Sequence, residues 1–324
     1  MNFNRKILDI GDVESIINKI ELFIKNQILY EFKKKGAVIG ISGGIDSALV
    51  LDLAVNALGK ENIFGVIMPE RDSDPQSKFL AEVLVKKYDI PFEIFDITKI
   101  LESYNIYEIR NSIIKNKFPK FNNLCKFGIK MSGNILENSH SFPYLEILDE
   151  NNQTHKITIS PSEYLSLTAA TSIKMRVRMS ILYFYGEKNN YSVLGTTNKT
   201  EWLQGYFVKY GDGGVDCEPI ADLYKSQIYQ LGKFLKLNKE VLEREPSPDS
   251  WSLGTSDKEF FFKLPYNILD LLLFANENKI SIDIIKETLN LSKEQIVKSL
   301  DDIKKKSENS KNKRQMPSIC KINL

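Results

Sequence analysis

The feature that most constrains the fold is an apolar run that ends in a glycine-rich turn. Residues 37–41, Ala-Val-Ile-Gly-Ile, are typical of a buried parallel strand, and Ser42-Gly-Gly-Ile-Asp-Ser47 follows directly. Because Gly43 and Gly44 carry no Cβ, the backbone there can bend sharply and approach an anion closely. The amides that open the next helix then point at that anion, and the helix dipole adds to the attraction. We therefore expect a strand, a phosphate-binding turn and a helix.

Other apolar segments alternate with helical patterns along the chain. Strands are expected at residues 63–68, 92–97 and 191–194, and helices at 13–28, 49–58, 77–88 and 166–185. Strands that alternate with helices of this length are the pattern of βαβ units. The expected fold class is therefore α/β, a doubly wound parallel sheet flanked by helices.

The alternation breaks between about Tyr104 and Leu165. Residues 144–148 and 155–159 flank the turn Asp149-Glu-Asn-Asn-Gln153, which predicts a hairpin inside this segment. We interpret residues 104–165 as an insertion in a single domain that spans residues 1–324. The end of the chain, from about residue 304 to 324, is charged and rich in Ser and Asn, so we expect it to be mobile.

Charge and composition exclude several classes of protein. The chain has 44 basic and 42 acidic side chains, and a net charge of +2 gives no electrostatic case for nucleic acid or an anionic membrane as partner. No apolar run approaches the roughly 18–20 residues that cross a bilayer, and the polar start does not resemble a signal peptide. The three cysteines are widely separated, as in a reduced compartment. We expect a cytoplasmic protein.

The glycine-rich turn carries a carboxylate where phosphate is expected. Asp46 would repel a phosphate unless a divalent cation lay between them, and Ser42 and Ser47 add hydroxyl donors. The alternative is a tight packing turn that binds nothing. No Gly-Lys-[Ser/Thr] follows, so this is not a P-loop. The turn resembles the Ser-Gly-Gly-x-Asp-Ser loop of N-type ATP pyrophosphatases, which holds the pyrophosphate released from ATP.

A second block narrows the resemblance to one family. Gly195-Thr-Thr-Asn-Lys-Thr-Glu201, Gly205-Tyr-Phe-Val-Lys-Tyr-Gly-Asp-Gly-Gly-Val-Asp216 and Pro219-Ile-Ala-Asp-Leu-Tyr-Lys225 resemble the core motifs of ammonia-dependent NAD synthetases over about thirty residues. Weaker similarity extends from about Val13 to Pro317, apart from the insertion. The resemblance implies the Rossmann-like fold of the ATP pyrophosphatases.

The resemblance also implies roles for individual residues. It implies an ATP site formed by Gly40, Ile41, Ser42, Gly43, Gly44, Ile45, Asp46, Ser47, Thr196, Lys225 and Ser247. It implies Asp46 and Glu201 as Mg²⁺ ligands, with Asp46, Glu201 and Lys225 as the catalytic residues. It implies contacts to deamido-NAD from Arg176, Lys209, Asp216, Asn312 and Lys313.

The implied reaction is amide formation driven by ATP. A substrate carboxylate attacks the α-phosphate to give an adenylate, and ammonia then displaces AMP, so no side-chain nucleophile is needed. The leading hypothesis is that deamido-NAD is the acid. A second hypothesis keeps this chemistry on a sugar acid or other nucleotide-linked acid. A tRNA-thiolating enzyme and a non-catalytic nucleotide-binding protein are less favoured, because charge, cysteine spacing and the paired Asp46 and Glu201 argue against them.

Departures from the family pattern cluster on the acid side. Thr171-Ser172 replaces Gly-Asn, Asn312 replaces histidine, and Glu70-Arg-Asp-Ser-Asp74 is unexpectedly acidic. The insertion is either a surface elaboration or a cover over the acid. We find no glutaminase motif, so we expect free ammonia or a separate glutaminase as the donor. The family resemblance also implies a homodimer. An apolar helical face is expected at its interface, with packing inside one subunit as the alternative: Leu167, Ala170, Ile173, Val177 and Ile181.

Overall fold

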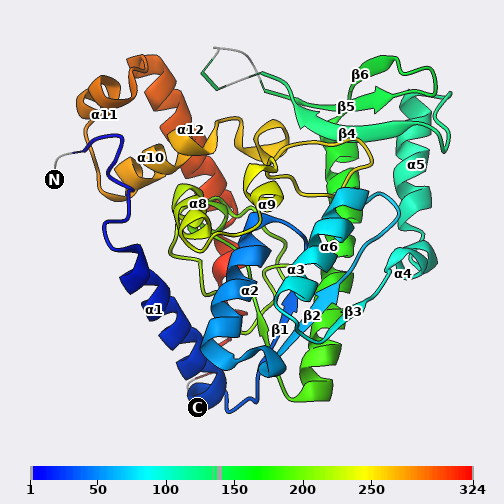
Figure 1. Cartoon of the computed structure of the whole chain (residues 1–324). Coiled ribbons are helices and arrows are strands. Elements are labelled where there is room, and N and C mark those ends of the chain that lie inside the picture. Colours follow the sequence, from blue (N-terminus) through cyan, green and yellow to red (C-terminus); the bar gives the residue numbers. More distant parts are fainter. Residues whose placement is uncertain (1–2, 134, 137–140, 323–324) are drawn as a thin grey trace.

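A four-stranded parallel sheet lies at the centre of the computed structural model, which describes residues 3–133, 135–136 and 141–322 (Figure 1). The strand order is β3–β2–β1–β7, formed by Phe92–Ile94, Ile63–Ile67, Ala37–Gly40 and Ser192–Leu194. Ala37 of β1 is paired with Ile63 of β2 on one side and with Ser192 of β7 on the other. The predicted parallel sheet is confirmed.

Helices cover both faces of this sheet, because successive residues of a strand point to opposite sides. Ile39 of β1 packs with α1 (Val13–Lys25), α2 (Ile45–Leu58), α3 (Pro75–Lys87) and α8 (Lys225–Phe234). Its neighbour Val38 packs with α4 (Thr98–Ser103) and α6 (Pro161–Asn189) on the other face. The sheet is therefore doubly wound, as predicted.

Two elements differ in length from the expectation. The third strand ends at Ile94 rather than at 97, because Thr98 N donates to Asp96 Oδ1 at 2.8 Å and the chain turns into α4. Helix α6 runs for 29 residues rather than from 166 to 185. Ser160 and Glu163 form a capping box at its start, and Asn190 ends it in the left-handed conformation.

The insertion folds as a helix and a three-stranded antiparallel sheet. These are α5 (Ile106–Lys117), β4 (Lys126–Met131), β5 (Pro143–Leu148) and β6 (Thr154–Thr158). The β5–β6 hairpin confirms the prediction, whereas α5 and β4 were not foreseen. Strand β4 also binds the body of the protein, since Leu253 N donates to Phe127 O at 2.8 Å and Phe127 N donates to Ser252 Oγ at 3.0 Å.

The apolar face of α6 that was considered for a dimer interface is buried inside the chain. Leu167 packs in the core of the insertion, and Val177 and Ile181 pack against the central sheet. That assignment was wrong, because a long helix between two cores hides its apolar side from a second subunit. The exposed side of α6 carries a different set of residues: Leu165, Ala169, Arg176, Ser180 and Phe184.

Short helical segments and a C-terminal group of helices complete the fold. The short segments are α7 (Lys199–Gln204), α9 (Lys239–Glu243), π-helical turns at Asn26–Glu31 and Lys258–Phe262, and 3₁₀ turns at Lys60–Asn62 and Lys311–Arg314. The C-terminal helices are α10 (Tyr266–Glu277), α11 (Ile282–Leu289) and α12 (Lys293–Asn309), and they share one apolar core. No helix among the described residues is long and apolar enough to cross a membrane.

The segment expected to be mobile is structured in its first part. Residues 304–309 are the last turns of α12, and Arg314 Nη1 donates to Trp202 O at 2.9 Å. The charged composition misled the prediction, because Lys306 reaches inward to Phe261 O at 2.8 Å instead of facing water. Mobility of residues 315–322 stays a prediction, and residues 323–324 lie outside the described residues.

Glycine at position 128 allows β4 to lie close to the body, which leads to a stability prediction. A Cβ there would lie 2.4 Å from Thr255 Oγ1 and 3.3 Å from Leu253 O. We expect Gly128→Ala to lower the free energy of unfolding by about 1–3 kcal/mol through overpacking. Gly254→Ala is the matched control, since a Cβ there meets nothing within 4 Å. Thermal unfolding measures both, and equal melting temperatures would contradict this packing.

Candidate active site

The glycine-rich turn lies at the carboxyl end of β1 and opens α2. Gly43 has a φ of +77°, and a Cβ there would lie 2.5 Å from Ser77 O, so a side chain would be both strained and in collision. Gly44 N donates to Ser42 Oγ at 3.2 Å, and the hydroxyls of Ser42 and Ser47 are 3.0 Å apart. The turn is thus held in shape by its own hydrogen bonds, with the amides of α2 at its centre.

A buried ammonium lies between two carboxylates beside this turn. Lys225 Nζ forms an ion pair with Asp46 and lies 3.9 Å from Glu201 Oε1, and the Lys225 side chain is only 2% exposed. Asn198 Nδ2 donates to the other oxygen of Asp46 at 3.0 Å. The sequence analysis expected these three charged residues in one site, and the structure brings them together from α2, α7 and α8.

Burial and mutual repulsion shape the ionisation of this group. Burial raises the pKa of Glu201 well above its usual value, and the nearby carboxylate of Asp46 raises the pKa further. Burial alone would lower the pKa of Lys225, but the two carboxylates outweigh it and raise that pKa. Lys225 therefore stays charged at neutral pH. Because one ammonium neutralises only one of the two carboxylates, a second cation would be bound favourably there.

The carboxylate pair fits a magnesium ion. Mg²⁺ is usually held by one or two carboxylates, with phosphate and water oxygens completing its shell. Asp46 and Glu201 supply two such carboxylates, both near the same ammonium. The described residues contain no group of three or more His, Cys, Asp or Glu side chains that could hold a metal ion by themselves.

Two adjoining cavities open around the turn. The larger, of about 370 Å³, is lined by Asp46, Ser47, Glu201, Lys225 and Ser247 among others. The smaller, of about 200 Å³, is lined by Gly40, Ile41, Met68, Leu182 and Gly195. Ser42 and Thr196 line both. Each residue predicted to bind ATP thus lines one or both of these cavities, except Gly43, which faces α3.

The residues predicted to bind the acid are only partly brought together. Lys209 Nζ donates to Asn312 O at 2.8 Å, and Arg176 Nε donates to Lys209 O at 3.4 Å. Lys313 lines the larger cavity and donates to Gly205 O at 2.8 Å. Asp216 lies apart, because its carboxylate accepts from Tyr183 Oη at 3.0 Å and from Val193 N at 2.8 Å. In this structure Asp216 ties α6 to β7.

The sequence analysis missed the residues that support the charged group. Thr200 Oγ1 accepts from Lys225 N at 3.0 Å and donates to Asp270 Oδ1 at 2.6 Å. Asp257 accepts from the hydroxyls of Tyr206 and Tyr266, each at 2.8 Å. Thr200 stands inside a recognised motif, so its position offered a signal. Asp257 and Asp270 offered none, because they lie far along the chain in an unremarkable context.

Glu218 was also not predicted, although it lies against Gly195, which lines the smaller cavity. Its Oε2 accepts from Thr197 N at 3.0 Å, and its carboxyl group packs on Gly195, where a Cβ would lie 2.2 Å away. Burial raises the pKa of Glu218 to about 8. This buried carboxyl group supports the turn that carries Thr196.

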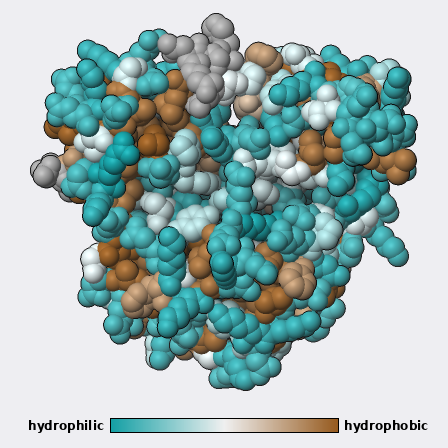
Figure 2. All heavy atoms as spheres, turned by 45° about the horizontal axis from the view of Figure 1, so that its top comes forward, coloured by the Kyte–Doolittle hydropathy of each residue, from teal (hydrophilic) through white to brown (hydrophobic). Residues whose placement is uncertain are grey.

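The insertion contributes to the wall of the larger cavity. Tyr164 and Thr168 at the start of α6 line it together with Trp251 and Phe260. Trp251 packs edge to face on Phe127 of β4, with ring centroids 5.9 Å apart. On the face shown in Figure 2, hydrophobic side chains gather in separate patches within a largely hydrophilic surface. The insertion is thus built into the cavity wall, whereas its action as a lid stays a prediction.

The fold and the glycine-rich turn define the class of protein. A doubly wound sheet with this turn at the carboxyl end of its first strand is the arrangement of ATP pyrophosphatases, which bind a nucleotide at that edge. Comparisons with known sequences agree. The family model described as NAD synthase matches residues 16–131 and 129–317.

Individual relatives and solved structures give the same result. Proteins named NH(3)-dependent NAD(+) synthetase are 37% identical over 275 residues in Rhizobium meliloti (85% of this chain, 82% of the relative) and 37% identical over 287 residues in Thermotoga maritima (86% and 94%). The NH3-dependent NAD synthetase structure from Campylobacter jejuni is 27% identical, with a TM-score of 0.64 over 96% of this chain and 100% of its own. The NMN synthetase from Francisella tularensis, 23% identical with a TM-score of 0.67 over 97% of this chain and 100% of its own, shares the fold. The chain belongs to the NAD synthase family.

Proposed function

We propose that the chain is a carbon–nitrogen ligase that converts deamido-NAD, ammonia and ATP into NAD, AMP and pyrophosphate. The observation that carries the proposal is the buried Lys225, paired with Asp46 in the first turn of α2 and 3.9 Å from Glu201. The relatives named NH(3)-dependent NAD(+) synthetase support deamido-NAD as the acid. A different carboxylate is less favoured, because the structure named NMN synthetase is only 23% identical and shares the fold alone, whereas the relatives named NAD(+) synthetase are 37% identical.

The mechanism follows from charge neutralisation. The amides of α2 and the hydroxyls of Ser42 and Ser47 bind the pyrophosphate as it leaves, and Lys225 stabilises the charge that develops on it. Mg²⁺ held by Asp46 and Glu201 would neutralise the phosphates so that the anionic acid can approach. The substrate carboxylate oxygen then bonds to the α-phosphorus while pyrophosphate departs. Ammonia attacks the resulting carbonyl carbon, loses a proton and expels AMP.

The acid and ammonia complete the proposal. Lys313 lines the larger cavity, and Arg176, Lys209 and Asn312 are joined by hydrogen bonds to one another, so this group supplies cations that suit the phosphates of a dinucleotide. A contact from Asp216 would require a rearrangement, since both of its oxygens are already used. We propose free ammonia, or ammonia from a separate glutaminase, as the nitrogen source and the cytoplasm as the location.

The reaction itself makes the first prediction here. Purified protein with ATP, MgCl₂, ammonium and deamido-NAD should form NAD, AMP and pyrophosphate in equal amounts, measured by chromatography. Omission of magnesium should stop all three products. ADP as the stoichiometric product would contradict attack at the α-phosphate, and AMP formation with other acids but not deamido-NAD would contradict the proposed substrate.

The role of Asp46 can be tested by one substitution. Asp46→Asn should keep the fold, since the amide has nearly the same shape and its oxygen can still accept from Lys225, yet it should lose the metal ligand and the hydrogen bond from Asn198. We expect kcat/KM to fall by about a hundredfold or more, equal to about 3 kcal/mol of transition-state stabilisation. Asp89→Asn is the control, because that carboxylate is 82% exposed in a surface pair with Lys60. Activity of Asp46→Asn within tenfold of the unsubstituted protein would remove Asp46 from the site.

We also propose a homodimer, now through the exposed side of α6. Leu165 and Phe184 are 65% and 57% exposed on that side, with Arg176 between them. Sedimentation should give twice the chain mass of 37.2 kDa, and Phe184→Glu should shift the protein toward monomer. Phe234→Glu, a residue 53% exposed on α8, is the control. A fully active monomer at micromolar concentration would overturn the dimer.

A further inference from the structure

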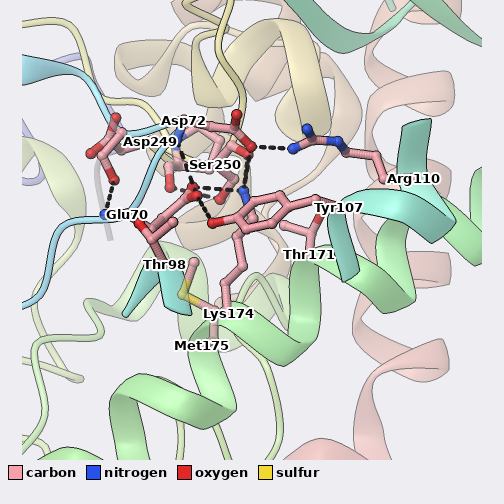
Figure 3. Close-up of polar contacts among 12 residues, drawn as sticks. Glu70, Asp72, Thr98, Tyr107, Arg110, Thr171, Lys174, Met175, Asp249 and Ser250 are labelled. Carbon is pink, nitrogen blue, oxygen red and sulfur yellow. Dashed lines mark hydrogen bonds and ion pairs between the residues drawn. The ribbon is translucent and has the colours of Figure 1, made fainter. Parts of the chain in front are cut away.

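A second buried charge cluster lies outside both cavities (Figure 3). Lys174 of α6 is its centre: Nζ donates to Glu70 Oε1 at 2.6 Å and to Asp72 Oδ2 at 3.1 Å. The insertion helix α5 supplies the remaining partners. Tyr107 Oη donates to Glu70 Oε2 at 2.7 Å, and Arg110 Nη1 donates to Asp72. The acidic segment 70–74 that stood out in the sequence is therefore the acceptor of this cluster.

The cluster is balanced in charge and enclosed. The side chains of Lys174 and Glu70 are 2% and 0% exposed, and those of Asp72 and Arg110 are each 6% exposed. Burial would raise the pKa of Asp72, but Lys174 and Arg110 outweigh that effect and lower it. Two carboxylates thus face two cations in a space with little water. Removal of one partner would leave an uncompensated buried charge.

One contact connects the cluster to the nucleotide cavity. The third donor bond of Lys174 Nζ goes to Ser250 O at 3.0 Å, in the segment 244–251 that carries Ser247. Two more hydrogen bonds join segment 244–251 to segment 70–77. Asp74 N donates to Asp249 Oδ1 at 2.8 Å, and Arg244 Nη2 donates to Ser77 Oγ at 2.7 Å. Ser77 in turn lies against Gly43 of the phosphate turn.

The geometry separates this cluster from the chemistry. Among the described residues that line the two cavities, none is a member of the cluster, whereas Ser247, Pro248 and Asp249 line the larger one. Lys174 lines neither cavity. Its hydrogen bond to Ser250 O joins it to a residue that does line the larger one.

We propose that Lys174 is a positioning residue for ATP. It holds segment 244–251 against segment 70–77, and α5 of the insertion completes the cluster through Tyr107 and Arg110. The insertion thereby stabilises segment 244–251 of the larger cavity through this cluster, in addition to contributing Tyr164 to the cavity wall. This inference rests on the proposed function in one respect only, namely that the cavities bind ATP.

The test is direct ATP binding, measured by calorimetry with MgCl₂ and without the acid. Lys174→Met should raise the Kd for ATP about tenfold, because a charged donor to Ser250 O is lost. At saturating ATP, kcat should stay within about threefold, and the KM for deamido-NAD should not change. Arg110→Met should raise the Kd in the same direction through Asp72.

Two controls separate positioning from general stability. Lys263→Met breaks a half-buried pair with Asp302, 2.9 Å apart and outside both cavities, so it should lower the melting temperature without changing the Kd for ATP. The double variant Glu70→Gln with Lys174→Met removes one charge of each sign. It should recover much of the melting temperature lost in Lys174→Met, yet ATP should still bind weakly, since Ser250 O still lacks its donor.

The outcomes distinguish this inference from the proposed function. ATP binding by Lys174→Met within twofold of the unsubstituted protein would overturn it. Recovery of ATP affinity together with the melting temperature in the double variant would also overturn it, because the cluster would then act through stability alone. Failure of the unsubstituted protein to bind ATP would instead contradict the proposed function.

Discussion

The ammonium of Lys225 is the interaction on which the site depends. It is 2% exposed and draws together Asp46 of α2 and Glu201 of α7, which lie far apart in the sequence. A buried cation of this kind is tolerable only with carboxylates around it, and two close carboxylates are tolerable only with a cation between them. Backbone hydrogen bonds fix this arrangement. Thr200 and Asp270 accept from the first amides of α8, so the first turns of α7 and α8 lie side by side.

The sheet and the phosphate turn could be predicted because their causes are local. Strand β1 is apolar since both of its faces are buried, and Gly43 is required by its positive φ and by its contact with Ser77. The charged residues Asp46, Glu201 and Lys225 were expected together because their motifs resemble those of NAD synthetases, and the structure brings them together. Their supporting partners Asp257 and Asp270 could not be found, because nothing near them in the sequence indicates which distant hydroxyl they accept from.

The insertion shows a second limit of local patterns. Its hairpin has a polar turn between two alternating strands, and this pattern was readable. Strand β4 was not, because its glycine and lysines fit no strand pattern until Gly128 is seen against Thr255 and Lys130 against Glu146 and Glu259. The apolar face of α6 was wrongly predicted to form a dimer interface for a related reason. Periodicity indicates that a face is buried, but it does not say whether the same chain or another covers it.

The two buried lysines, Lys174 and Lys225, differ in how many hydrogen-bond donors they have left for a ligand. An ammonium has three protons. Lys174 gives all three to acceptors at 2.6, 3.0 and 3.1 Å, so no proton is left for a ligand. Lys225 pairs closely with Asp46 but lies 3.9 Å from Glu201, beyond hydrogen-bond distance, and it faces the larger cavity. A phosphate oxygen can therefore take up the remaining donor capacity of Lys225. Two equally buried lysines therefore differ in the donor capacity that is left for a ligand, because the fold uses all three protons of Lys174 but not all those of Lys225.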